Sequence, residues 1–208
     1  FCSETELLMM RKQQLAQGNP PRYNGRCRQL TADQVAEKKE HGQSASLRFH
    51  VPSQQTLRVD DFVKGEQTFF TDDIGDFVIQ RSDGSAAFFF CNAIDDALMN
   101  VTHALRGEDH LTNTPRQILL LQTLGLRHPN YGHIALIVGD EGTPLSKRGG
   151  SFSIKKLRER GYFAEALQNY LARLGHTYTN PNFLDISALA EQFSLKRLGK
   201  SPARFDEA

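Results

Sequence analysis

The segment GDEGTPLSKRGGSF, residues 139–152, places Ser146, Lys147 and Arg148 side by side between glycines, with Pro144 just ahead. A stretch with so much glycine and proline cannot continue a helix or a strand, so it is predicted to be a loop. Its lysine could bind a phosphate chain as a point charge, and its arginine as a planar fork of donors. The same residues also fit a solvated basic turn, and the neighbouring elements must decide between the two.

The elements around this loop favour the phosphate-binding interpretation. The apolar run HIALIVG, residues 133–139, predicts a buried strand directly before the loop. Beyond the loop, apolar residues recur with helical spacing from Phe163 to Leu174, and Gly175 ends that predicted helix. The strand-loop-helix order puts the loop at the carboxyl end of a strand, where open α/β sheets bind ligands.

Local signals predict most of the other elements. Capping signals mark three helix starts, at Ser3 with Glu6, at Thr31 with Gln34, and at Thr114 with Pro115 and Gln117. Short β-like runs between residues 46 and 90 predict strands in LRFHV, TLRVDDFV, QTFF, DFVIQRS and AAFFF. The segment ALMNVTHALRG (97–107) is expected to form a turn that leads into a strand, and a further helix is expected near residues 185–193. The order is helical first, then strands, then α/β alternation, then helices.

The segment THALRGEDHLTNTPRQ, residues 102–117, concentrates charge around a strand-to-helix passage. Its ionisable side chains are Arg106, Glu108, Asp109, His110 and Arg116. Such a density requires solvation or pairing. Two interpretations follow: a surface turn in which Arg106 pairs with a neighbouring acid, or a polar pocket in which Arg106 receives a carboxylate bidentately.

Cysteines and paired acids give weaker indications. Cys91 follows three phenylalanines and is predicted to be a buried core residue. Asp95 and Asp96 could bind a metal or an amine, or simply cap a helix or turn. Cys2 and Cys27 flank a proline-rich loop, but a structural zinc takes four ligands and no histidine lies nearby. The histidines show no metal-ligand spacing and are taken as structural or exposed.

Composition places the chain among ordinary globular proteins. It has 208 residues, 39% hydrophobic and 24% charged, and its net charge of +1 gives no global argument for or against nucleic acid. No apolar run is long enough to span a membrane, and the N-terminus does not resemble a signal peptide. Three sparse cysteines fit a reducing cytoplasm. Because the chain begins with Phe1, we expect a fragment, a processed product or part of something longer.

Read together, these segments resemble bacterial glutamyl-tRNA synthetases, a family of class I aminoacyl-tRNA synthetases, over nearly the whole chain. The resemblance rests on an ordered set of segments: FCSETEL, GNPPRYNGRCRQL, DDFVKG, DFVIQRSDGS, DDALMNVTHALRGEDHLTNTPRQILL, PLSKR, GYFAEALQNYLARLG and FSLKRLGKSPARFD. RGEDHLTNTPRQ is the most specific of these.

The resemblance implies roles for individual residues. PLSKR stands where the family carries its version of the K-M-S-K-S loop, which closes over ATP. Lys147 would contact ATP, with Ser146 and Arg148 supporting the loop. Arg106 matches an arginine associated with glutamate binding, and Asn92 a further substrate-pocket position.

The chain also departs from the family pattern. Pro144 replaces the first lysine of the loop motif, which removes a cation and a backbone donor. Phe88 stands where many relatives have a tyrosine, so the glutamate pocket loses one hydroxyl. Cys2 and Cys27 match two positions of the zinc set found in some relatives, but Gln29 occupies the last position and the set is incomplete. The H-I-G-H segment and the anticodon-binding domain are not in the sequence.

The resemblance implies the second half of a Rossmann-type α/β catalytic domain with an α+β insertion. We expect an insertion that contacts the tRNA acceptor end over 1–75, the catalytic half over 76–150, and the start of a helical stem-contact region over 151–208. The implied activity is a cytoplasmic glutamate–tRNA ligase that uses ATP and Mg²⁺ in protein biosynthesis, with these residues inactive on their own. Two alternatives stay open: a paralogue that glutamylates a modified tRNA base, and a non-catalytic tRNA-binding module.

Overall fold

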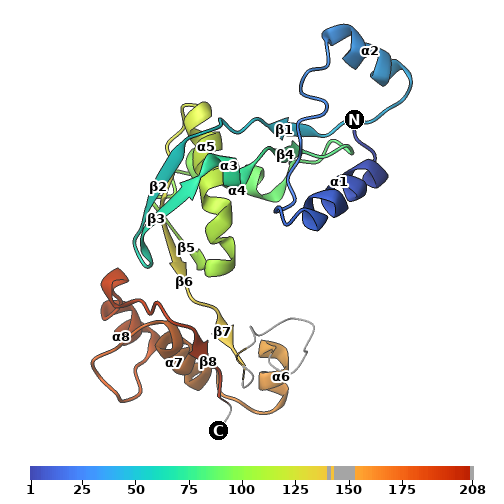
Figure 1. Ribbon diagram of the computed structural model, residues 1–208. Coiled ribbons are helices and arrows are strands. Elements are labelled where there is room, and N and C mark those ends of the chain that lie inside the picture. Colours follow the sequence, from blue (N-terminus) through green and yellow to red (C-terminus); the bar gives the residue numbers. More distant parts are fainter. Residues whose placement is uncertain (140–141, 143–152, 207–208) are drawn as a thin grey trace. The chain divides into compact units, whose positions relative to one another are not determined.

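The computed structural model describes residues 1–139, 142 and 153–206, and Figure 1 shows its helices and strands. The helices are α1 (Glu4–Ala16), α2 (Ala32–Glu40), α3 (Thr71–Ile74), α4 (Phe88–Leu98), α5 (Thr114–Thr123), α6 (Ile154–Glu159), α7 (Ala164–Gly175) and α8 (Ile186–Glu191), with 3-10 helices η1 (Glu108–Asn113) and η2 (Leu195–Arg197). The strands are β1 (Leu47–Phe49), β2 (Thr56–Asp61), β3 (Gly65–Phe70), β4 (Phe77–Gln80), β5 (His103–Gly107), β6 (Asn130–Ile134), β7 (Ile137–Val138) and β8 (Ala203–Arg204). Within the described part of the chain, no helix is both long enough and apolar enough to cross a membrane.

The described chain forms two compact units. The first unit comprises Phe1–Val59, Thr68–Thr102 and Asn113–Pro129, and the second unit comprises Asp60–Gln67, His103–Thr112 and Asn130–Ala208. The chain therefore passes between the units several times. The boundaries expected at residues 75 and 150 divide the chain by its expected roles in the enzyme, and they stay predictions.

Local capping chemistry places the first two helices where the sequence predicts them. The Ser3 hydroxyl accepts a hydrogen bond from the Glu6 N–H at 3.2 Å, and the Glu6 carboxylate accepts one from the Ser3 N–H at 2.9 Å. Thr31 and Gln34 form the same reciprocal pair at the start of α2. Two otherwise unsatisfied backbone donors are thus paired at each helix start.

The predicted strand AAFFF is wrong, because these phenylalanines begin a helix. Aromatic side chains favour strands locally, but packing decides the outcome here. Phe89 packs edge-on against Phe77 of β4 at 5.2 Å, and Ala93, one helical turn further along α4, is completely buried. The helix turns Cys91 toward solvent, so the prediction that Cys91 is buried is wrong too.

Two further predictions need correction at element ends. The residue before α5 is Asn113, with no side-chain cap, and Thr114 and Pro115 are its first two helical residues. Gln117 is fully buried and does not close a capping box. The predicted continuous strand HIALIVG is interrupted after Ile134 and resumes at Ile137.

The core of the first unit lies between the β1–β4 pair and the α4–α5 pair. β1 and β4 run antiparallel, with Phe49 opposite Phe77 and their rings stacked at 5.2 Å. Val51, Leu119 and Leu120 complete the buried cluster. Burying one such side chain contributes roughly 1.5–3 kcal/mol, so this apolar contact holds helices and strands together.

The second unit is organised around β5 and β6, which run parallel with Arg106 opposite His133. The end of β2 extends this arrangement, because the Phe62 N–H donates to the Tyr131 carbonyl at 3.1 Å. The Phe62 ring then lies directly over Gly132, where an added Cβ atom would come within 2.2 Å of the ring. β7 and β8 also pair in parallel.

The packing over Gly132 yields a prediction. Gly132→Ala should lower the free energy of unfolding by about 1–3 kcal/mol, because the methyl group forces the Phe62 ring or β6 to move. Urea denaturation measures the change. Gly175→Ala is the matched control, since a Cβ atom there meets nothing within 4 Å. Alanine at Gly175 should leave stability unchanged or raise it by about 0.5–1 kcal/mol. Equal losses in both variants would contradict the packing argument.

Candidate functional site

The loop motif predicted to bind phosphate falls outside the part of the chain that the structure describes. This applies to Pro144, Ser146, Lys147 and Arg148. The flanking elements agree with the predicted order, because β7 ends at Val138 and α6 begins at Ile154. The roles of the loop residues therefore stay predictions.

Arg106, the residue matched to glutamate binding, lies on β5 in the second unit. Its Nε donates a hydrogen bond to Nε2 of His133 at 3.1 Å. Its guanidinium carbon lies 4.9 Å from the centroid of the Tyr131 ring. One edge and one face of the guanidinium group are thus held by neighbouring side chains. The nearby acid Glu108 accepts instead from Lys64 at 2.5 Å, and this hydrogen bond holds the pKa of Glu108 below its usual range.

His133 is held in turn by Asp61, and both side chains are fully buried. The His133 Nδ1 lies 2.5 Å from Asp61 Oδ2. Asp61 Oδ1 accepts from the backbone N–H groups of Val63 at 2.9 Å, Lys64 at 2.8 Å and His133 at 3.2 Å. Burial opposes ionisation of Asp61, but these hydrogen bonds outweigh burial and lower its pKa. Burial and the nearby Arg106 charge lower the pKa of His133 despite Asp61.

Phe88 and Asn92, the other two residues matched to substrate binding, lie one turn apart on α4 in the first unit. Phe88 is 61% exposed, so its ring is not part of the core. Asn92 Oδ1 accepts a hydrogen bond from Nε2 of Gln117 at 2.8 Å. Gln117 comes from α5, so this contact engages the carbonyl oxygen of the Asn92 side chain and leaves donation to its NH₂ group. Burial lowers the pKa of the neighbouring Arg116.

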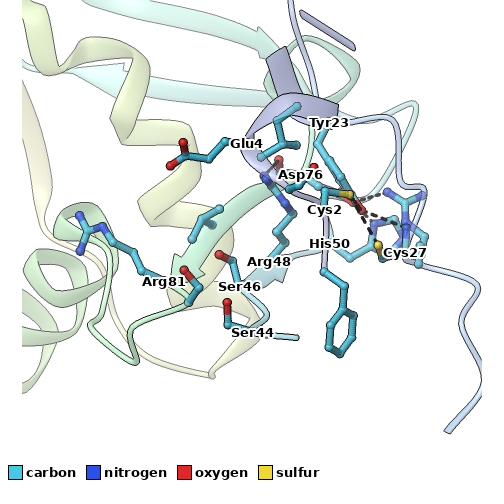
Figure 2. A pocket seen from close by; sticks show the side chains of 16 residues that line it. Cys2, Glu4, Tyr23, Cys27, Ser44, Ser46, Arg48, His50, Asp76 and Arg81 are labelled. Atoms are coloured by element: carbon cyan, nitrogen blue, oxygen red, sulfur yellow. Dashed lines mark hydrogen bonds and ion pairs between the residues drawn. The ribbon is translucent and has the colours of Figure 1, made fainter. Parts of the chain in front are cut away.

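A cavity of about 740 Å³ opens beside β1 and β4 of the first unit (Figure 2). Basic side chains on its wall are Arg28, Arg48, His50 and Arg81. The carboxylate of Asp76 balances part of this charge: it accepts from Arg28 and from the Val51 N–H, and lies 3.1 Å from His50 Nδ1. These contacts overcome the effect of burial and lower the pKa of Asp76.

Cys2, Cys27 and Tyr23 meet at one end of this cavity, as the dashed lines in Figure 2 show. The two sulfur atoms are 3.6 Å apart, and the Tyr23 hydroxyl lies 3.7 Å from Cys2 Sγ. The Tyr23 oxygen also accepts from the Cys27 N–H at 3.0 Å. The guanidinium carbon of Arg48 lies 4.2 Å from the Tyr23 ring centroid. Burial and the neighbouring Cys27 thiol raise the pKa of Tyr23.

This cluster only partly fits a zinc ion. Two thiolates bound at about 2.3 Å in a tetrahedron would lie about 3.8 Å apart, close to the observed 3.6 Å. Tyr23 could add one oxygen, which makes three donors. Among the described residues, no group of three or more histidine, cysteine, aspartate or glutamate side chains could hold a metal. A structural zinc takes four ligands, so the described residues do not complete a site.

Three functional candidates were not foreseen from the sequence. Asp61 and His133 are 72 positions apart, and only the contact of the end of β2 with β6 brings them together. Tyr23 and Cys27 are four positions apart, a spacing that could have drawn attention to them, but they lie in a loop where that spacing has no fixed meaning.

Comparison with known proteins defines the class. The model of the family described as "tRNA synthetases class I (E and Q), catalytic domain" matches residues 1–208, and the chain belongs to this family. Glutamate–tRNA ligase 2 of Nitrosococcus oceani is 62% identical over 206 residues, which are 99% of this chain and 44% of that protein. Glutamate–tRNA ligase 1 of Methylococcus capsulatus is 59% identical over 206 residues, again 99% and 44%. The chain thus spans less than half the length of these relatives.

Solved structures agree with the sequence matches. The crystal structure of a glutamate tRNA ligase from Elizabethkingia meningosepticum in complex with its amino acid aligns with a TM-score of 0.87 and 28% identity. The alignment covers 99% of this chain and 46% of that one. The glutamate-tRNA synthetase of Elizabethkingia anophelis aligns with a TM-score of 0.88 at 28% identity, over all of this chain and 47% of that one. The α/β catalytic fold predicted from the sequence is confirmed.

The thiol cluster yields a prediction. Burial acts to raise the pKa of Cys27, but hydrogen bonds from Tyr23 and Cys2 outweigh burial and lower it. Tyr23→Phe removes one of these hydrogen bonds, so the pKa of Cys27 should rise and its thiolate fraction near neutral pH should fall. Timed iodoacetamide labelling, resolved by peptide mass spectrometry, should show slower alkylation of Cys27. The exposed Cys91 is the internal reference. An unchanged ratio of the two rates would contradict the role of Tyr23.

Proposed function

We propose that this chain acts within a glutamate–tRNA ligase, which activates glutamate with ATP and Mg²⁺ and transfers it to the 3′ end of tRNA. The observation that carries this proposal is the 62% identity, over 99% of the chain, with a protein named glutamate–tRNA ligase. Because the chain spans 44% of that relative, the activity is proposed for the complete gene product. A cytoplasmic location would follow from this role.

Within the enzyme, Lys147 would contact the ATP phosphates, and Ser146 and Arg148 would support the loop. Bound ATP with Mg²⁺ would supply an activated α-phosphorus atom for attack by the glutamate carboxylate, with pyrophosphate as the leaving group. Phosphoryl chemistry depends mainly on positioning and on charge stabilisation, which a lysine and an arginine in a loop can provide. With Pro144 in place of the family's lysine, this segment has one cation and one backbone donor fewer for ATP.

Recognition of glutamate would fall to Arg106, Asn92 and Phe88. Arg106 suits a carboxylate because a guanidinium group can donate two parallel hydrogen bonds. Asn92 has its carbonyl oxygen engaged by Gln117, which favours its amide N–H groups as donors to substrate. Phe88 would provide an apolar wall and no hydrogen bond.

Transfer RNA would contact both ends of the chain. Residues 1–75 would form the insertion that meets the acceptor end, and residues 151–208 the start of the stem-contact region. The arginines of the cavity in the first unit support the assignment of residues 1–75, because Arg28 and Arg48 could neutralise phosphates. These basic groups are local, consistent with a net charge of only +1.

The proposal predicts that the complete gene product carries out glutamate-dependent ATP–pyrophosphate exchange and that Lys147→Ala slows this exchange on the order of 100-fold. Lys155→Ala is the matched control, since the Lys155 side chain is 85% exposed and pairs only at 4.0 Å with Glu159. Exchange should remain with that control. The 208 residues alone should show no exchange.

The alternatives give different results in the same assays. A paralogue that modifies a tRNA base would form the adenylate but leave the tRNA 3′ end uncharged. A non-catalytic module would bind tRNA without any exchange. Either outcome would reject the proposed ligase activity.

A further inference from the structure

We propose that Asp61 and His133 are positioning residues for glutamate recognition, which hold Arg106 so that its two terminal nitrogens face a carboxylate. This inference rests on the proposed function, because it assigns Arg106 to the substrate. Neither Asp61 nor His133 would touch glutamate. They would act through Arg106, because the Asp61 carboxylate holds the His133 imidazole and that imidazole holds the Arg106 guanidinium group.

The contacts of His133 fix the tautomer of its imidazole ring. Ionised Asp61 only accepts hydrogen bonds, so Nδ1 of His133 at 2.5 Å must carry the proton. Nε2 of the neutral ring is then a bare acceptor, which is what the Nε–H of Arg106 at 3.1 Å requires. The opposite tautomer, or a doubly protonated ring, would bring two donors face to face. Asp61 therefore selects the only form of His133 that can hold Arg106.

The Asp61 carboxylate is held rigidly. Asp61 sits at the end of β2, where three backbone N–H groups fix its Oδ1 atom. Its side chain and that of His133 are fully buried, so water does not compete for their hydrogen bond. A carboxylate held at both oxygens leaves the imidazole little freedom to rotate.

Two contacts orient the guanidinium group of Arg106. His133 occupies the Nε position of Arg106, and the Tyr131 ring covers one face at 4.9 Å. A planar fork with its Nε and one face engaged meets a carboxylate end-on, through its terminal nitrogens. Such an orientation gives paired, parallel hydrogen bonds rather than a general attraction for anions.

Asp61→Asn tests this series of contacts at its origin. The asparagine oxygen can still accept from the backbone N–H groups, but its NH₂ would face Nδ1 of His133. The imidazole would then change to the Nε2–H tautomer and lose its hydrogen bond with Arg106. This logic is known from catalytic triads, in which the same substitution fixes the wrong tautomer.

The assay is glutamate-dependent ATP–pyrophosphate exchange by the complete gene product. We expect Asp61→Asn to raise the KM for glutamate about tenfold or more while the KM for ATP stays unchanged. A smaller folded fraction would lower only the apparent kcat, so this split distinguishes positioning from loss of structure. Asp60→Asn, the exposed neighbour on β2, is the matched control and should leave both constants unchanged.

A second pair of variants covers poor folding of Asp61→Asn. His133→Gln keeps an amide donor toward Asp61 and a carbonyl acceptor toward Arg106, so it should recover much of the affinity for glutamate that His133→Leu loses. Nitrogen-15 NMR of the imidazole should show the Nδ1–H tautomer in the wild type and the Nε2–H tautomer in Asp61→Asn.

The outcomes separate this inference from the proposed function. Active wild type together with an unchanged KM for glutamate in Asp61→Asn would overturn the positioning role and leave the ligase activity standing. An Nε2–H tautomer in the wild type would overturn it as well. Wild type without exchange in the presence of glutamate would reject both.

Discussion

The hydrogen bond between Asp61 and His133 is the contact on which the second unit depends. It joins the end of β2 to β6, and both side chains are fully buried, away from water. Removing one partner of this hydrogen bond would leave a buried polar or charged group unsatisfied, at a cost of about 1–3 kcal/mol and more where that group is charged. The same junction places the Phe62 ring over Gly132 and sets the line of β6, whose partner β5 carries Arg106.

Sequence predicts the elements of this protein where the deciding contacts are local. The capping boxes of α1 and α2 involve residues three positions apart, so the signal and the structure coincide. The start of α4 follows a different rule, because its phenylalanines have strand propensity and are helical through packing on Phe77. Likewise the sequence predicts Gln117 in a capping box, but its side chain donates a hydrogen bond to Asn92 of another helix. Where local propensity and a buried contact favour different structures, the buried contact decides when it contributes more stabilising free energy.

The candidate site divides along the same line. Arg106 could be named from the charged segment that contains it, whereas Asn92 and Phe88 could be named only through the resemblance to the family. Asp61 and His133 could not, since an aspartate after a strand and an apolar-flanked histidine are unremarkable until 72 positions of chain are folded between them. Tyr23 was missed for a related reason: its hydroxyl acts on Cys2 and Cys27 through the path of a loop that no periodicity predicts.

Charge balance explains why such an anchor suits a recognition site. The charges of the ionised Asp61, the neutral His133 and the cationic Arg106 sum to zero. The buried carboxylate of Asp61 is therefore tolerated before any ligand binds. An arginine without a counter-charge would attract anions of every shape. With Asp61 behind it, part of that attraction is offset, and the orientation of the guanidinium fork gains weight in selecting among ligands. A carboxylate that matches the fork gains two hydrogen bonds at once, whereas a spherical anion such as chloride gains no comparable geometric fit. Selectivity at Arg106 would then arise from direction more than from charge.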